Sequence, residues 1–253
     1  MSLTLAIETS SIEYGVALFT PDALIAHRTL RRDDPSFRGI GELAAELLTA
    51  AGRRIRDVER LAVDLGPGNL SSVRAGVAYV NGLAFSLGIP IFGVSSLDLL
   101  AVEASEKADP AEGSGSAVLC LRNAGGGNVY AGRYRGGVTG LTGGAGDGAV
   151  QLRRGPLAPV VTAMVGGPGG AAGSGGGAGS GGVGLSRVLV AGSFRREVAA
   201  VLAEALPSVA VSDTGIEVPP VLALYRLVTI AGGVPVDPVC VASPLTDSSP
   251  VFR

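Results

Sequence analysis

The stretch DLGPGNLSSVRAGVAYVNG, residues 64–82, joins the end of a strand to a glycine loop and a long helix. The Gly-Pro-Gly motif is typical of a tight turn, and Asn69 has the short polar side chain preferred at a helix N-cap. The helix is predicted to span residues 69–87, with Gly88 ending it. Strand, turn and helix in this order are typical of α/β folds.

This helix is almost without charge, because Arg74 is the only charged residue between Asp64 and Asp98. A surface helix normally has an apolar stripe on one side only. Here the helical wheel has two such sides, one with Val73, Val77, Val80, Ala84 and Leu87, the other with Ala75, Ala78, Tyr79, Gly82 and Phe85. Two interpretations follow: the helix is enclosed within its own domain, or another chain covers it.

The glycine loop also has features of an anion site, since the free amides and the dipole at a helix start favour negative charge. The candidate residues for a weak nucleotide or phosphate contact are Thr9, Ser10, Gly66, Gly68, Ser71 and Arg74. The Walker pattern is absent, and Lys107 is the only lysine of the chain. Helix capping and turn formation are therefore the alternative explanation of these residues.

The segments around this stretch alternate between strand and helix patterns. Gly52 is placed to end the first helix. The predicted strands are 3–7, 15–19, 23–30, 61–65 and 89–94, and the predicted helices are 40–48, 69–87 and 95–104.

A polar connection, KADPAEGSGS, precedes a second set of strands and helices. The glycine-rich residues 164–184 are expected to form a surface loop, to which no role is assigned. The pattern predicts two α/β lobes: an N-terminal lobe over 1–105, a linker over 106–116 and a C-terminal lobe over 117–253.

Composition excludes several classes of function. The net charge of -2 and the pI of about 5.5 do not favour nucleic acid or a membrane surface. The single histidine, His27, lies in a strand-like segment and excludes a histidine-rich metal centre. Cys120 and Cys240 lack CxxC spacing, which suggests buried thiols, and the N-terminus lacks a signal-peptide pattern. A cytoplasmic protein is expected.

Two runs resemble the bacterial TsaB family, also called YeaZ. These are IETSSIEYGVAL, residues 7–18, and GPGNLSSVRAGVAYVNGLAFSLGIPIFGVSSLDLLA, residues 66–101. VYAGRY at 129–134 and the final PVFR are similar to further motifs of that family. The resemblance covers residues 3–104 well and the second half in patches.

The resemblance implies a two-lobe actin/Hsp70/sugar-kinase-like α/β fold (ASKHA, ribonuclease H-like). It also implies a non-catalytic partner of the transferase TsaD, which with the ATPase TsaE forms N6-threonylcarbamoyladenosine at position 37 of tRNA. tRNA would then be bound only indirectly, through the complex. The resemblance implies no catalytic residue, no metal and no cofactor, with weak ATP or ADP binding at the partner interface left open.

The family's contact with TsaD uses helices of the N-terminal lobe, which correspond here to residues 40–48 and 70–87. The predicted contact residues are Ile40, Leu43, Leu47, Val73, Gly76, Val77, Val80 and Ala84. The same helices could pair two copies of the chain when the partner is absent, giving a homodimer. The alternative function is an ASKHA-type nucleotide-dependent phosphotransferase, with Glu8 as the acid that orients a metal.

Overall fold

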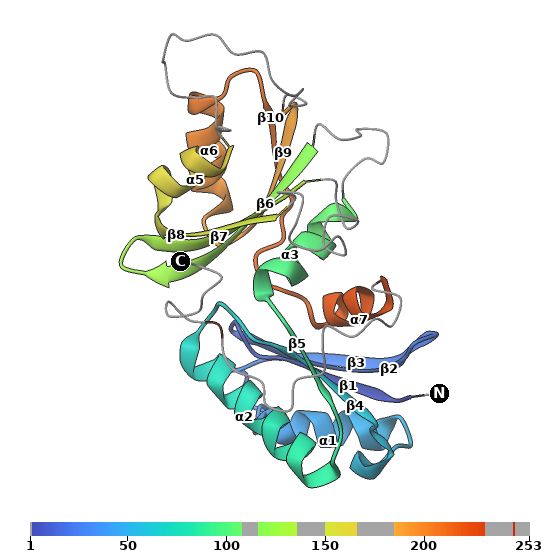
Figure 1. Ribbon diagram of the computed structural model, residues 1–253. Coiled ribbons are helices and arrows are strands. Elements are labelled where there is room, and N and C mark those ends of the chain that lie inside the picture. Colours follow the sequence, from blue (N-terminus) through green and yellow to red (C-terminus); the bar gives the residue numbers. More distant parts are fainter. Residues whose placement is uncertain (1, 108–115, 136–149, 166–184, 231–244, 246–253) are drawn as a thin grey trace. The chain divides into compact units, whose positions relative to one another are not determined.

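The computed structural model describes residues 2–107, 116–135, 150–165, 185–230 and 245 (Figure 1). These residues form two compact units, which are described separately. The first contains the chain up to Glu103 and the described residues from Val218 onward, and the second begins at Ala104 and ends at Glu217. The glycine-rich segment 166–184 and Cys240 lie outside the described residues.

The first unit is built on a five-stranded sheet with the order β3-β2-β1-β4-β5. β1, β2 and β3 are antiparallel neighbours, whereas β4 and β5 run parallel to β1. The predicted strands of this half are confirmed. They are β1 (Thr4–Glu8), β2 (Glu13–Thr20), β3 (Ala23–Arg31), β4 (Arg60–Asp64) and β5 (Ile91–Val94).

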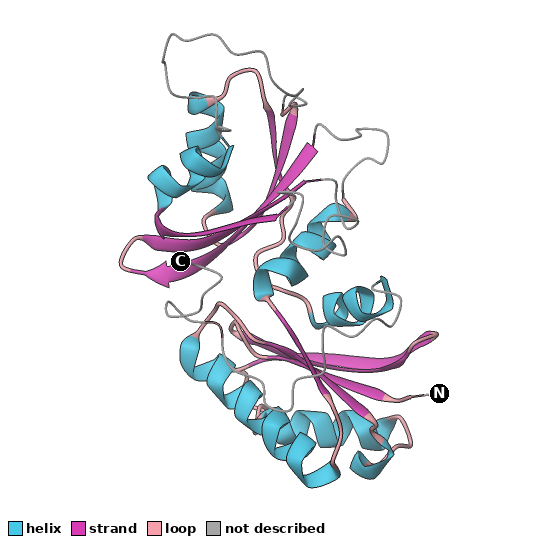
Figure 2. Ribbon diagram, in the orientation of Figure 1, coloured by secondary structure: helices cyan, strands magenta, loops and turns pink. Residues whose placement is uncertain are grey.

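Helices α1 (Ile40–Ala50) and α2 (Leu70–Leu87) cover one face of this sheet (Figure 2). The predicted caps of α2 are confirmed: Asn69 accepts a hydrogen bond from the Ser72 amide, and Gly88 ends the helix in the left-handed conformation. A short 3₁₀ helix, η1 (Ile55–Asp57), connects α1 to β4, and α3 (Ser96–Ser105) follows β5.

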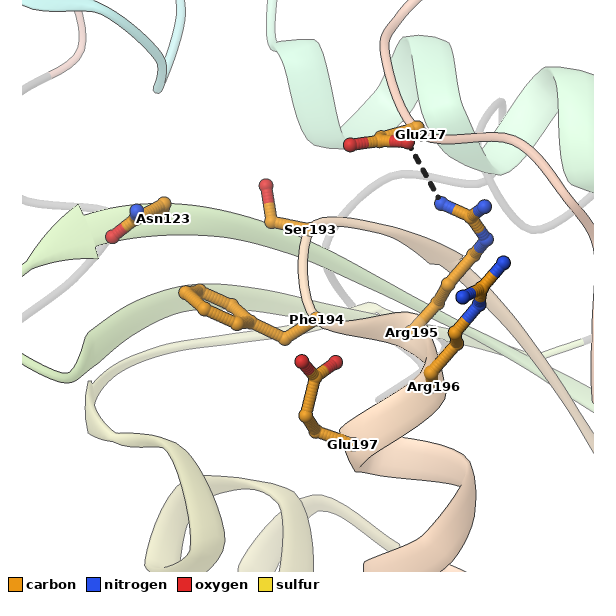
Figure 3. A pocket seen from close by; sticks show the side chains of 7 residues that line it. All are labelled: Asn123, Ser193, Phe194, Arg195, Arg196, Glu197 and Glu217. Atoms are coloured by element: carbon orange, nitrogen blue, oxygen red, sulfur yellow. Dashed lines mark hydrogen bonds and ion pairs between the residues drawn. The ribbon is translucent and has the colours of Figure 1, made fainter.

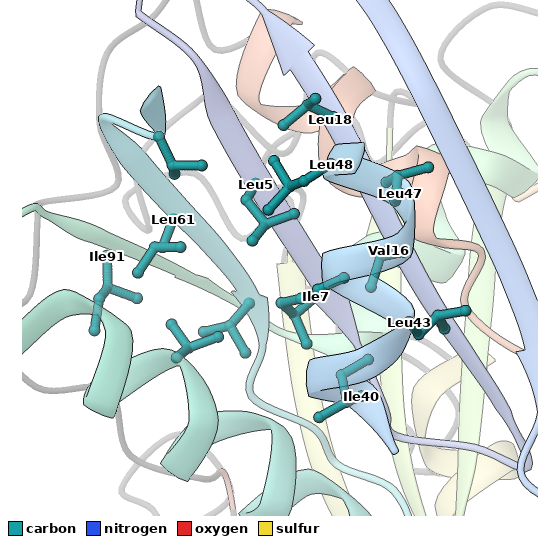
Figure 4. Close-up of a cluster of buried hydrophobic side chains, with 14 of the residues drawn as sticks. Leu5, Ile7, Val16, Leu18, Ile40, Leu43, Leu47, Leu48, Leu61 and Ile91 are labelled. Atoms are coloured by element: carbon teal, nitrogen blue, oxygen red, sulfur yellow. The ribbon is translucent and has the colours of Figure 1, made fainter. Parts of the chain in front are cut away.

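The core between these helices and the sheet consists of branched aliphatic side chains (Figure 4). Each fully buried side chain of this type stabilises the fold by about 1.5–3 kcal/mol relative to exposure. The central members are Leu5, Ile7, Val16, Leu18, Ile40, Leu43, Leu47, Leu48, Leu61 and Ile91. Gly76 allows α2 to lie close to the β1–β2 turn, because a Cβ atom there would be 2.2 Å from Thr9 Oγ1.

Helix α7 (Val221–Ile230) packs on the opposite face of the same sheet, although it follows the second unit in the sequence. Val221 and Leu224 contact the alanine-rich side of the strands, and the ring of Tyr225 meets that of Phe19 edge-on at 5.1 Å. The predicted C-terminal lobe included all of residues 117–253. The structure differs here, since the buried face of α7 matches strands that lie far away along the chain.

The second unit repeats the strand order of the first, β10-β9-β6-β7-β8. Helices α5 (Leu157–Val165) and α6 (Arg195–Ala205) pack on one face of this sheet. The predicted second set of strands and helices is present in this unit. The strands are β6 (Ser116–Gly125), β7 (Asn128–Arg135), β8 (Val150–Pro156), β9 (Arg187–Gly192) and β10 (Ala210–Asp213).

The structure also places the single histidine and one of the two cysteines. His27 lies on β3 with an exposed side chain, as expected of a strand-surface histidine. Cys120 is buried in β6, as expected of a buried thiol. Among the helices of the described ranges, none combines the length and the hydropathy needed to cross a bilayer.

Candidate functional site

The predicted contact residues lie on the inward side of α1 and α2, where they form part of the core. Val80 is completely buried, Val77 is 3% exposed, and none of the side chains in this set exceeds 9%. Gly76 is buried as well. The predicted contact face is therefore wrong, because its residues pack on their own sheet and are not available to a second chain. These residues are Ile40, Leu43, Leu47, Val73, Gly76, Val77, Val80 and Ala84.

The other side of α2 is exposed and carries a single charge. We call it the outward face of α2, and its exposed residues are Leu70, Ser71, Arg74, Ala75, Ala78, Gly82, Phe85 and Ser86. Phe85 is 92% exposed, the highest value among the large exposed apolar residues. A Cβ atom added to Gly82 would meet nothing within 4 Å. This side of α2 is thus not enclosed in its own unit, and it carries few of the charged side chains that are usual on a solvent-facing helix.

Helix α1 lies beside α2 and has a different outer side. A Cβ atom on Gly41 would be 3.2 Å from the ring of Tyr79, so the two helices approach closely at this point. Burial at this point raises the pKa of the Tyr79 phenol. The outer side of α1 carries Glu42 and Glu46, and Glu46 forms an ion pair with Arg28 of β3. Of these two helices, α2 is therefore the one whose outer side has few charges.

The glycine loop and the β1–β2 turn hold each other through internal hydrogen bonds. Thr9 Oγ1 donates to the Ser72 carbonyl oxygen at 2.9 Å, and the Asn69 amide donates to the Ser10 carbonyl oxygen at 2.8 Å. The amide and hydroxyl of Ser10 both donate to Glu8 Oε1, at 2.6 and 2.7 Å. Thr9 and Ser10 are buried, so their hydroxyl groups support the turn.

The remaining candidate phosphate contacts are divided between structural roles and solvent. The Gly66 amide donates to Asp64 Oδ1 at 2.7 Å, and the Ser71 hydroxyl donates to Asn69 Oδ1 at 2.8 Å. Gly68 is partly exposed, and Arg74 extends from α2. The carboxylate of Asp64 also accepts a hydrogen bond from Ser96 Oγ at 2.7 Å. This arrangement stabilises the loop, and no geometry for the phosphotransferase alternative arises from it.

The second unit contains a pocket of about 490 Å³ that sequence reasoning missed (Figure 3). Its lining residues are Asn123, Ser193, Phe194, Arg195, Arg196, Glu197 and Glu217. Arg195 forms ion pairs with Asp213 at 2.9 Å and Glu217 at 3.1 Å. The hydrogen bond to Glu217 is the main cause of the raised pKa of Arg195, and the two acids balance its charge.

One signal could have located this pocket. The segment Ser193–Phe194 follows a parallel strand and precedes a helix, which is a common position for binding sites in α/β sheets. Phe194 adopts a left-handed conformation with φ of 62°, which is uncommon for a residue other than glycine. Asn123 and Glu217 come from distant parts of the unit, and no local pattern joins them to this segment. Within the described ranges, no group of three or more His, Cys, Asp or Glu side chains is placed to hold a metal ion.

Comparisons with known proteins show which proteins this chain resembles. The family model described as "TsaD: tRNA N6-adenosine threonylcarbamoyltransferase" matches residues 37–161. The tRNA threonylcarbamoyladenosine biosynthesis protein TsaB of Bacillus subtilis (strain 168) is 35% identical over 132 residues, covering 52% of this chain and 54% of that protein. TsaB of Escherichia coli (strain K12) is 32% identical over 131 residues, with the same shares covered.

The chain thus spans about half the length of the curated relatives it matches. A crystal structure of a Pseudomonas aeruginosa protein, described as similar to peptidase YEAZ, has a TM-score of 0.67 to this chain at 23% identity. That similarity covers 97% of this chain and 99% of the other, and it shows a shared fold. The two α/β units are those expected of an ASKHA fold. The N-terminal half of this chain is thus similar in sequence to the TsaB proteins, and nearly the whole chain shares the fold of a YeaZ-like protein.

Proposed function

We propose that this protein is a non-catalytic partner of a TsaD-type threonylcarbamoyltransferase in the formation of N6-threonylcarbamoyladenosine at position 37 of tRNA. The curated relatives are described as biosynthesis proteins for this modified nucleoside, and the matching family model is that of the transferase itself. A role in tRNA modification through protein contact is consistent with both descriptions.

The observation that carries the proposal is the outward face of α2. A phenylalanine that is 92% exposed on a helix of small uncharged residues is unfavourable in water, since each large apolar side chain gains about 1.5–3 kcal/mol on burial. Aromatic anchors beside small residues are typical of protein–protein contacts, because the anchor fills a pocket while the small residues allow close approach. The partner is therefore proposed to cover this face, and not the inward residues.

On this proposal the chain performs no transfer chemistry and needs no cofactor of its own. The hydroxyl and amide groups around the glycine loop are used for internal hydrogen bonds, which argues for a structural role of this loop. Weak ATP or ADP binding would then depend on groups supplied by the partner. TsaE and tRNA would join through the transferase complex in the cytoplasm, and a homodimer would compete for the same face.

The test is reconstitution with the TsaD homologue from the same cell. The proposal predicts that the two proteins co-purify as a stable complex. It also predicts that this chain alone transfers no threonylcarbamoyl group to tRNA, and that it increases transfer when added to the TsaD and TsaE homologues. Transfer by this chain alone, or the absence of any complex, would refute the proposal.

A further inference from the structure

The outward face of α2 has two chemically different ends. Arg74 and Phe85 are 11 residues apart, which places them about 16 Å apart along the axis and about 20° apart around it. They therefore lie on one stripe of the helix. Between Arg74 and Phe85 no large side chain projects from this stripe, because Ala78 is small and Gly82 has no side chain. One end of the stripe carries a cation and the other an aromatic ring.

The cation at the first end of the stripe has no counter-ion among the described residues. Among the residues that the structure describes, no hydrogen-bond or ion-pair partner is found for the Arg74 guanidinium, and α2 contains no acidic residue. Arg32 brings a second guanidinium to this end, where it donates to Ser72 Oγ at 2.8 Å. The positive pole of the helix dipole also lies here. The two guanidinium groups and the helix dipole all make the electrostatic potential at this end positive.

The acidic residues nearest in sequence to Arg32 are already occupied. Asp33 forms an ion pair with Arg31 at 2.8 Å, and Asp34 accepts hydrogen bonds from Ser36 at 2.6 and 2.8 Å. The carboxylates at the ends of β1 and β4, Glu8 and Asp64, are buried and hold their own turns. Within the described part of the chain, the first end of the stripe is therefore positive.

We propose that the transferase partner places a carboxylate against Arg74 and an apolar pocket around Phe85. This inference rests on the proposed function and adds the chemistry of the partner's surface. A flat, uncharged stripe of small residues by itself fixes neither the direction nor the register of a partner helix. An Arg–carboxylate pair at one end and a buried ring at the other fix both, because a reversed partner would leave the cation against an apolar pocket.

The two ends are assigned different kinetic roles. Exposed charges at the rim of an interface mainly change the association rate and its salt dependence, whereas buried anchors mainly change the dissociation rate. Arg74 therefore guides and orients the partner, and Phe85 retains it. Arg74 is a specificity-determining residue and takes no part in the chemistry of transfer.

The test measures association and dissociation rates with the immobilised TsaD homologue at low and high salt. Arg74→Glu should reduce the association rate about tenfold at low salt, and the reduction should shrink at high salt because salt screens the field. Arg74→Ala should have a smaller effect of the same kind. Phe85→Ser should raise the dissociation rate about tenfold or more and leave the association rate nearly unchanged.

The matched control is Arg53→Glu, which makes the same change of charge at an exposed arginine between α1 and η1. Its association rate should stay within about twofold of the wild-type rate. Equal effects of Arg74→Glu and Arg53→Glu, or a loss that is independent of salt, would overturn this inference while leaving the proposed function intact. Absence of wild-type binding would overturn both. Variants that change only the self-association of this chain would assign the face to a second copy and refute the inference.

Discussion

The two units of this protein share a strand order and differ in the surface of one helix. In each unit, the central strand begins an antiparallel meander of three strands on one side and a run of parallel strands on the other. α2 of the first unit and α6 of the second both follow the parallel strand next to the central one. They are equivalent by topology, so a difference between them is not dictated by the fold.

The outer sides of α2 and α6 differ in charge. α2 has 18 residues and one charged side chain, Arg74. α6 has 11 residues and four, Arg195, Arg196, Glu197 and Glu204, of which the first forms ion pairs with Asp213 and Glu217. Charged and paired side chains are typical of a helix that faces solvent, whereas an outer side with few charges is typical of an interaction surface. The comparison supports the proposed docking surface on the first unit.

The largest expected effect separates the two sides of α2. Val80→Asp places a charge in the core and should reduce the free energy of unfolding by about 4 kcal/mol or more, since no partner is available there. Ala78→Asp, on the outward face, should cost less than about 1 kcal/mol. Urea denaturation followed by circular dichroism measures both values. Similar losses for the two variants would mean that α2 has no solvent-facing side.

The next effect concerns affinity for the partner. Phe85→Ser should weaken binding to the TsaD homologue by about 2 kcal/mol or more, roughly 30-fold in Kd, because it removes an aromatic anchor. The control is Ile25→Ser, which changes a 38%-exposed apolar residue of β3 in the same unit. Isothermal titration calorimetry gives both constants. Equal Kd values for the two variants would remove Phe85 from the contact.

The close approach of α2 to the β1–β2 turn can be tested with two glycines of the same helix. Gly76→Ala should destabilise the protein by about 1–3 kcal/mol, because its Cβ would lie 2.2 Å from Thr9 Oγ1. Gly82→Ala should stabilise it by about 0.5–1 kcal/mol, since alanine favours a helix and meets no neighbour there. Thermal unfolding measures both changes. A stabilising Gly76→Ala would show that the turn can move away.

The smallest expected effect concerns Asp57, a partly exposed acid of the first unit that lies outside α2. The Arg54 backbone amide donates a hydrogen bond to Asp57, which holds the pKa of this carboxyl below its ordinary value of 3.8. Its contribution to stability is thus fully present above about pH 4 and is lost as the pH falls through the lower pKa of the folded state. Urea titrations at neutral and acidic pH should show Asp57→Asn slightly less stable only at neutral pH. A difference that persists at low pH would contradict this assignment.

Local chemistry made the elements of the first unit predictable. Asn69 and Gly88 mark the ends of α2 through capping, and the alternation in β1 and β2 follows from burial of the strands. The orientation of α2 could not be predicted in the same way, because both of its sides are apolar and only their steric fit to the sheet distinguishes them. The branched side chains of Val73, Val77 and Val80 fill the core, and the small residues remain outside.

Contacts between residues far apart in the sequence explain most of the remaining features that the sequence did not predict. α7 returns to the first sheet because Val221 and Leu224 match the small side chains of Ala6 and Ala62, which a local pattern cannot show. β8 was missed because its Arg153 and Arg154 interrupt the apolar alternation of a strand. The pocket of the second unit depends on Asn123, Ser193 and Glu217, which are far apart along the chain.

The most direct test of the central claim is the binding of Ala78→Asp to the TsaD homologue, measured beside the wild-type chain by calorimetry. The substitution places a charge in the middle of the outward face of α2 while leaving the core untouched. The account predicts that the wild-type chain forms a complex and that Ala78→Asp unfolds like the wild type but does not bind. Wild-type affinity of a folded Ala78→Asp variant would contradict it.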